Sequence, residues 1–250
     1  MYKNWIISII ISIIILITVF VIYKYSYNKT DISICMWYDD GIKEYADLAK
    51  KINQKYCDIH GYDLILDDTI RLPNRSKQWE KISYILNLLN TTKYEYIIWI
   101  DADACFNLNN SNKYILQNII KKYKDKDIIF SADLTMKINS GFFIIKNTQY
   151  SKNLLNNIIN SNITKCKLYK KTYHEQTCFN HLYETNIYDL KNNSVIIPYG
   201  KLQVITNSYI NTNLEEHKDS LVYHYAAEKK EYRINKFNEN IKKYNNIVNG

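Results

Sequence analysis

Two aspartates, Asp101 and Asp103, directly follow an apolar run, and their types and spacing suit metal chemistry. The run, Tyr96 to Ile100, has the β-branched and aromatic character of a buried strand. Side chains two positions apart on an extended chain project to the same side, and only Ala102 separates the pair. Two carboxylates at one point repel each other unless a cation lies between them, and oxygen ligands suit Mg²⁺ or Mn²⁺. The pair therefore predicts a metal site that can also hold the diphosphate of a nucleotide.

Other polar side chains stand beside predicted strands or begin a predicted helix. Asn139 precedes an apolar strand, where its amide could bind a sugar hydroxyl or serve only as a turn residue. Glu175 and Gln176 begin a predicted helix, and helix capping is the competing interpretation for them. His224 directly follows an apolar strand, and Lys229 comes five residues later. Imidazole is a good Mn²⁺ ligand and an ammonium group pairs well with a diphosphate, so both are candidates.

The elements that must position these residues alternate between strands and helices. Strands are predicted at 32–37, 62–66, 96–100, 127–131, 141–146, 195–197 and 221–223. Helices are predicted at 42–57, 76–89, 112–124, 149–160 and 174–184, followed by a basic helix at 232–248. This order predicts an α/β fold with a mainly parallel central sheet flanked by helices. In such sheets ligands bind at the carboxyl ends of the strands, which is where the aspartates stand.

Composition excludes several other classes of protein. The five glycines are too scattered for a dinucleotide fingerprint or a phosphate-binding Walker loop. The net charge of +8 comes from lysines spread along the chain without a dense basic run, so no nucleic-acid partner is expected. The five cysteines form no Cys-x-x-Cys pair and are expected to be buried, although Cys166 and Cys178 could pair in an oxidising compartment.

The N-terminal region is predicted to be a membrane anchor. Residues 5–22 are uncharged and apolar, and as a helix they would span about 27 Å, close to the thickness of a bilayer core. A cleaved signal peptide is the alternative, but its cleavage site needs small residues and the first alanine is Ala46. We expect a tail at 1–4, a transmembrane helix at 5–22, a stem at 23–30 and a catalytic domain at 31–250 that ends in the basic helix. The flanking charges do not decide the orientation.

Several motifs stand in an order that resembles a known family. They are the segment 53–62, which ends in His-Gly-Tyr; the segment 79–103, a lysine-containing helix leading to Trp-x-Asp-x-Asp; Asn-Ser-Gly at 139–141; Glu-Gln at 175–176; and His-Tyr-Ala-Ala-Glu-Lys at 224–229. Together they resemble glycosyltransferase family 34, a group of retaining galactosyl-, mannosyl- and xylosyltransferases of Golgi membranes. The sequence departs from the family at Ala227, where glycine is usual, and at His174, where an acidic residue is common.

The resemblance implies a Rossmann-like GT-A fold and a metal-dependent transfer of a hexosyl or pentosyl unit from a nucleotide-diphosphate sugar to a glycan or glycoprotein, with retention. It implies Asp101, Asp103 and His224 as ligands of Mn²⁺ or Mg²⁺; Asp101, Lys229 and Lys81 as donor-binding residues; and Gln176, Glu175 and Asn139 as catalytic residues. It also implies a single-pass type II membrane protein with its catalytic domain in the Golgi or ER lumen, able to form homo- or hetero-oligomers with other glycosyltransferases.

Two alternative functions remain open from the sequence. A haloacid-dehalogenase-like phosphatase also carries Asp-x-Asp after an apolar strand, but its motif continues with Thr or Val, whereas Ala104 follows here. The chain could also be a non-catalytic membrane lectin, or a nucleotide-sugar-binding scaffold subunit of a glycosyltransferase complex.

Overall fold

The computed structural model describes residues 11, 13–18, 31–109, 115–167, 174–206, 212 and 216–245. The chain divides into two units, Met1–Asp31 and Ile32–Gly250. In the first unit, residues 13–18 are helical and their apolar side chains are exposed. Most of the predicted anchor at 5–22 and the whole predicted stem at 23–30 lie outside the described residues. Among the described residues, no helix is long and apolar enough to cross a membrane.

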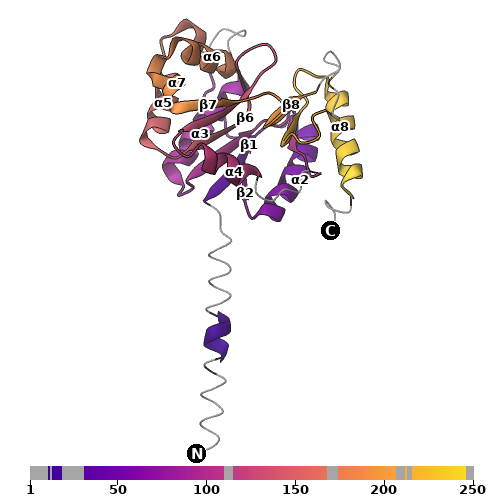
Figure 1. The fold of residues 1–250 in the computed structure, drawn as a ribbon. Helices are drawn as coiled ribbons and strands as arrows, with labels where there is room; N and C mark the ends of the chain where they lie inside the picture. Colours follow the sequence, from indigo (N-terminus) through magenta and orange to yellow (C-terminus); the bar gives the residue numbers. More distant parts are fainter. Residues whose placement is uncertain are drawn as a thin grey trace, which may run out of the picture. The chain divides into compact units, whose positions relative to one another are not determined.

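A six-stranded sheet forms the centre of the second unit (Figure 1), in the order β2-β1-β3-β6-β5-β7. Its strands are β1 (Ile32–Trp37), β2 (Asp63–Asp67), β3 (Tyr96–Ile100), β5 (Ile128–Ala132), β6 (Ile138–Lys146) and β7 (Ser194–Ile197). β1 is parallel to β2 and β3, and β5 is parallel to β7. Only β6 runs antiparallel to its neighbours, β3 and β5. The predicted α/β fold with a mainly parallel sheet is therefore confirmed, with β6 as the reversed strand.

A second, smaller sheet joins the centre of the chain to its C-terminal part. It has the order β4-β9-β8, and its strands are β4 (Ala104–Phe106), β9 (Val222–His224) and β8 (Gln203–Ile205). β4 pairs antiparallel with β9, which sets Ala104 opposite His224. The sequence did not predict β4 or β8, because three residues carry too little periodicity to mark a strand without its partner.

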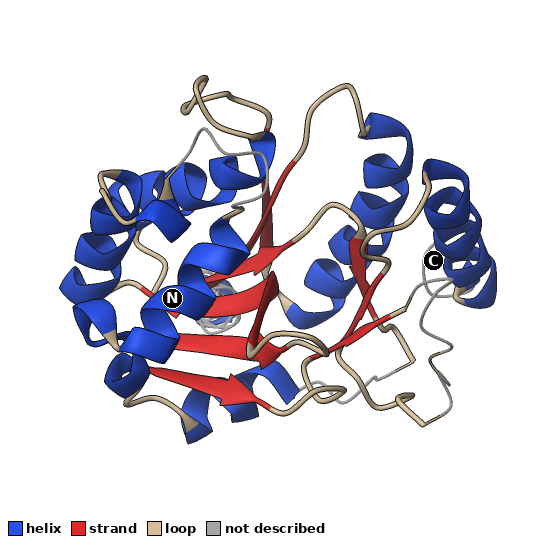
Figure 2. Cartoon of the chain, turned by 90° about the horizontal axis from the view of Figure 1, so that it is seen from above, coloured by secondary structure: helices blue, strands red, loops and turns tan. Residues whose placement is uncertain are grey.

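Helices cover both faces of the central sheet (Figure 2). They are α2 (Lys43–His60), α3 (Glu80–Thr91), α4 (Ile115–Lys122), α5 (Gln149–Ile159), α6 (Glu175–Thr185), α7 (Leu190–Asn193) and α8 (Lys230–Lys243), with short 3-10 turns at Lys77–Trp79, Thr164–Cys166 and Ile187–Asp189. α2 continues beyond its predicted end at residue 57 to His60, and it ends there because Gly61 adopts the left-handed conformation at φ 72° that a residue with a Cβ avoids. The predicted start of α4 at 112 lies outside the described residues, and α8 begins two residues earlier than predicted.

Both faces of the central strands are buried, which explains their unbroken apolar character. In β1, Ile34 and Met36 pack into the hydrophobic cluster that includes residues of α2 and α8. Cys35 and Trp37 point the opposite way, into the cluster that includes residues of α3, α5 and α6. α2 and α8 lie side by side although almost the whole domain separates them in sequence (Figure 1). This packing carries the beginning of α8 to the end of β3.

Candidate functional site

The turn that follows β3 carries the aspartate pair. β3 ends at Ile100, the N–H of Asp101 donates to the carbonyl oxygen of Gly141 at 2.8 Å, and the N–H of Ala104 donates to that of Asp101 at 3.0 Å. The expectation that alternation along an extended strand brings the two carboxylates together is therefore wrong in its detail. The two carboxylates are instead brought together by a turn. The carbonyl oxygen of Asp103 in this turn accepts from the N–H of Tyr225 at 2.9 Å. The turn is thus fixed to β6 on one side and to the end of β9 on the other.

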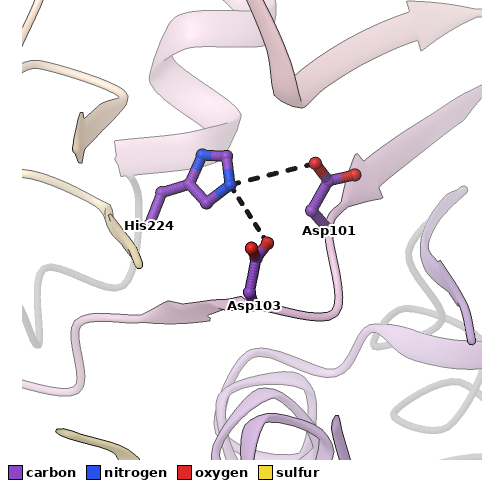
Figure 3. Close-up of side chains that lie close together, drawn as sticks. All are labelled: Asp101, Asp103 and His224. Atoms are coloured by element: carbon purple, nitrogen blue, oxygen red, sulfur yellow. Dashed lines mark hydrogen bonds and ion pairs between the residues drawn. The ribbon is translucent and has the colours of Figure 1, made fainter. Parts of the chain in front are cut away.

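His224 brings an imidazole to this turn from 121 residues further along the chain. Its Nε2 lies 3.1 Å from Oδ1 of Asp103 and 3.8 Å from Oδ2 of Asp101 (Figure 3). One ligand atom from each of the three residues lies within 4.8 Å of the other two. The three residues that the family resemblance implies as metal ligands therefore come together, drawn from the end of β3 and the end of β9.

The charges at this cluster suit a cation. Burial alone would lower the pKa of His224, but Asp103 and Asp101 raise it above its ordinary value. Burial alone would raise the pKa of Asp103, but His224 and Arg233 lower it. Both shifts favour a charged pair, in which the imidazolium supplies the positive charge that a divalent ion can supply in its place. Two carboxylates and an imidazole are a donor set for Mn²⁺, and Mg²⁺ takes the carboxylates, so the residues present fit a divalent ion.

Lys81, on α3, neutralises the opposite side of Asp101. Its Nζ lies 2.9 Å from Oδ1 of Asp101 and 2.8 Å from Oε1 of Glu175, and donates to the carbonyl oxygen of Ser140 at 3.0 Å. Burial would lower the pKa of Lys81, but the two carboxylates raise it, so the ammonium group stays charged. The Nε1 of Trp99 donates to the same oxygen of Asp101 at 2.6 Å. These contacts fix the carboxylate of Asp101 so that its Oδ2 faces His224.

A second network orders the polar residues of β6 and α6. Asn139 donates to Asp133 at 2.7 Å, and Gln176 donates to the same carboxylate oxygen at 3.4 Å. The Oε1 of Gln176 accepts from the N–H of Ser140 at 3.0 Å, and the hydroxyl of Ser140 donates to Glu175 at 2.9 Å. Capping alone does not describe Glu175, because its side chain is only 5% exposed and pairs with Lys81. Lys81, Glu175, Gln176 and Asn139 thus belong to one connected polar network.

A cleft of about 390 Å³ opens beside the aspartates. Its walls come from the ends of β1 and β3, from α2 and α3, and from the beginnings of α6 and α8. Asp101, Asp103, Lys81 and Glu175 line it. Lys229 is not among the lining residues; it is exposed at the residue before α8, and within the described ranges its ammonium group forms no ion pair.

Arg233 and Asp133 belong to the site although no motif in the sequence indicated them. Arg233 lines the cleft and its Nη2 lies 2.7 Å from Oδ2 of Asp103. One signal could have found it: Arg233 follows Lys229 by four residues at the start of a helix, so the two stand one turn apart on the same face. Asp133 directly follows β5, just as Asp101 directly follows β3. This shared position at a strand end could have indicated Asp133 as a site residue.

Glycosyltransferases are among the solved structures that share this fold. A glycosyltransferase involved in glycosylation of the major capsid of PBCV-1 superposes with a TM-score of 0.67 at 18% identity, covering 83% of this chain and 98% of that one. The galactosyltransferase LgtC, solved with donor and acceptor sugar analogues, superposes with a TM-score of 0.53 at 12% identity. The match covers 84% of this chain and 95% of LgtC. These likenesses define the fold as that of a GT-A glycosyltransferase.

The family follows from the sequence itself. Residues 21–234 match the profile of the galactosyl transferase GMA12/MNN10 family, and the chain belongs to it. The resemblance to glycosyltransferase family 34 is thereby confirmed. Xyloglucan 6-xylosyltransferase 4 of Arabidopsis thaliana is 26% identical over 119 residues, 43% of this chain and 22% of that protein. Galactomannan galactosyltransferase 1 of Cyamopsis tetragonoloba is 26% identical over 105 residues, 38% and 23% respectively. The chain matches less than a quarter of the length of these two relatives.

Proposed function

We propose that this protein is a metal-dependent glycosyltransferase that moves a hexosyl or pentosyl unit from a nucleotide-diphosphate sugar to a glycan or glycoprotein acceptor. One observation carries the proposal: Asp101, Asp103 and His224 converge beside a cleft at the carboxyl end of β3, in a chain of a glycosyltransferase family. The carboxyl ends of parallel strands are where such sheets bind ligands. The family and the fold favour this function over the phosphatase alternative.

The metal ion, Mn²⁺ or Mg²⁺, would be held by Asp101, Asp103 and His224. When bound, the ion would supply the positive charge that stabilises the charge on a diphosphate leaving group. Lys81 and Trp99 keep the carboxylate of Asp101 in place, since both donate to its Oδ1. Lys229 would approach the diphosphate from the start of α8.

Glu175, Gln176 and Asn139 would bind the transferred sugar or the acceptor. Glu175 lines the cleft, and its buried Oε2 has no hydrogen-bond partner among the described residues. A buried carboxylate oxygen without a partner is costly, and a sugar hydroxyl can satisfy it. Asp133 holds the amides of Gln176 and Asn139, which orients both before substrate binds. We extend the proposal to transfer with retention, as in the family.

We also propose a type II membrane protein whose catalytic domain faces the lumen of the Golgi or ER and associates with other glycosyltransferases. The apolar run at 5–22 supports the anchor. The disulfide between Cys166 and Cys178 supports an oxidising compartment, since cytosolic thiols stay reduced.

The test is a panel of nucleotide-sugars incubated with the full chain and Mn²⁺, with transfer and hydrolysis measured separately. We expect one donor to be consumed in a Mn²⁺-dependent reaction and the variant Asp103→Asn to be inactive. Asp125→Asn is the matched control, because Asp125 is 69% exposed and lies outside the site. Undiminished turnover by Asp103→Asn would refute the proposal. Tight binding of donor without any turnover, alone or with a partner, would support the scaffold alternative.

A further inference from the structure

Arg233 reaches the aspartate pair from α8, beyond every motif that marked the site in the sequence. Its Nη2 lies 2.7 Å from Oδ2 of Asp103, while the Nε2 of His224 faces Oδ1 of the same carboxylate at 3.1 Å. The two oxygens of Asp103 therefore have different partners. Oδ1 faces the metal-ligand cluster, and Oδ2 faces the guanidinium.

The guanidinium is held firmly in place. Its Nε donates to the carbonyl oxygen of Tyr225 at 3.1 Å and its Nη1 donates to the hydroxyl of Tyr45 at 3.4 Å. The Cζ atom lies 5.0 Å from the centre of the Tyr45 ring, within the range of a cation–π contact. The side chain is 16% exposed, so most of its surface is already packed. A ligand that meets this group would order little that is not ordered already.

The same guanidinium still has donors to offer. Of the five N–H groups of an arginine side chain, three are used by Asp103, Tyr225 and Tyr45. Two have no partner among the described residues, and Arg233 lines the same cleft as Asp101 and Asp103. A planar guanidinium with two free donors beside a metal site matches phosphate oxygens, which it can bind in a bidentate manner.

We propose that Arg233 binds the diphosphate of the donor while it keeps its contact with Asp103. This inference rests on the proposed function, and it adds a residue that the family resemblance did not imply. In that arrangement the carboxylate of Asp103 lies between the bound metal ion and the guanidinium of Arg233, so these two cations share one anion. Lys229, exposed and without an ion pair within the described ranges, does not account for a fixed cation at this position.

The proposal predicts opposite effects on two ligands. Without diphosphate, Arg233 places a positive charge beside an incoming metal ion and weakens its binding. With diphosphate present, the same charge is attracted to the ligand. Removal of the guanidinium should therefore leave Mn²⁺ alone bound as tightly as in the wild type, or more tightly, and weaken the binding of diphosphate. A residue that merely orders Asp103 would instead reduce metal affinity when removed.

The experiment measures Mn²⁺ alone by electron paramagnetic resonance, and then inorganic pyrophosphate by calorimetry at saturating Mn²⁺, using the full chain. We expect Arg233→Met to bind pyrophosphate about tenfold more weakly than the wild type, and Arg233→Lys to fall between the two. Lys236→Gln is the matched control, since it removes a positive charge from the same helix, one turn away. Among the residues that the structure describes, Lys236 pairs only with the exposed Glu239 and the ring of Tyr232. Thermal unfolding of each variant checks that it is folded. If Arg233→Met does not fold, the pyrophosphate affinity of Arg233→Lys tests the proposal in its place.

Two results would overturn the inference alone. One is pyrophosphate affinity in both Arg233 variants within about twofold of the wild type. The other is a loss of Mn²⁺ affinity as large as the loss for pyrophosphate. If the wild type itself bound neither Mn²⁺ nor pyrophosphate, the proposed function would fail as well. The behaviour of the wild type therefore distinguishes a failure of the proposed function from a failure of this inference.

Discussion

The imidazole of His224 lies directly against the backbone of Gly141. A Cβ built on Gly141 would be 2.2 Å from Cε1 of His224 and 2.6 Å from its Nδ1. Atoms do not approach so closely, so only glycine leaves room for the ring. Gly141, predicted as the first residue of a strand, thus lies within β6, and the absence of a side chain there makes space for the imidazole of His224.

Gly141→Ala should displace His224 and reduce metal affinity. The alanine methyl group forces the ring or the strand to move, at a cost of about 1–3 kcal/mol in the free energy of unfolding. The measurement is a Mn²⁺ titration beside a denaturant unfolding curve. Gly61→Ala is the control, because Gly61 ends α2 in the left-handed conformation and its replacement costs stability away from the site. Unchanged Mn²⁺ affinity in Gly141→Ala would show that the ring does not need this space.

Lys81→Met should destabilise the protein strongly. Lys81 and Glu175 are each only 5% exposed at their side chains, and Asp101 shares the same ammonium group. Removing the cation leaves Glu175 charged and buried without a counter-ion, which costs about 3–5 kcal/mol. The free energy of unfolding in urea measures this loss. The double variant Lys81→Met, Glu175→Gln should recover part of it, and a single variant as stable as the wild type would contradict the account.

Site residues that directly follow strands could be predicted from the sequence, whereas site residues that depend on helix packing could not. Asp101 and His224 could be placed at strand ends because unbroken apolar runs mark strands that are buried on both faces. That Ala104 lies opposite His224 could not be predicted, since β4 exists only through its pairing with β9. Arg233 was missed for a similar reason: its contact with Asp103 depends on how α8 packs against α2, and local periodicity carries no information on that packing.

Asp133 should give the protein a pH-dependent stability on the acid side. Burial would raise its pKa, but hydrogen bonds from the backbone N–H of Thr135 and from Asn139 lower it below the ordinary value of 3.8. A carboxyl with a lowered pKa in the folded state contributes stability above its unfolded pKa, and loses it as pH falls through the folded value. Unfolding free energies below pH 4 should therefore decline less in Asp133→Asn than in the wild type. Parallel declines would contradict this role.

Ala227 adopts a backbone conformation that favours glycine. Its φ is 57°, in the left-handed region, and it stands where the family usually has glycine. A left-handed alanine costs about 1–2 kcal/mol, part of which the greater freedom of an unfolded glycine offsets. Ala227→Gly should therefore raise the free energy of unfolding by up to about 1 kcal/mol, which thermal unfolding can measure. Ala226→Gly is the control, since Ala226 has no positive φ and should lose stability instead.

The disulfide between Cys166 and Cys178 fastens the helix that carries Glu175 and Gln176. Cys178 lies in the first turn of α6 and Cys166 in the short 3-10 turn at Thr164–Cys166, and the two are 12 positions apart in sequence. A loop of this length predicts a stabilisation of about 3 kcal/mol from the closed bridge. The double variant Cys166→Ala, Cys178→Ala should lose that stability and also bind a sugar donor more weakly, because the start of α6 is released. Cys57→Ala, a buried thiol in α2 outside the bridge, is the control. Loss of stability without any change in donor affinity would mean that Lys81 and Asp133 alone hold the two side chains in place.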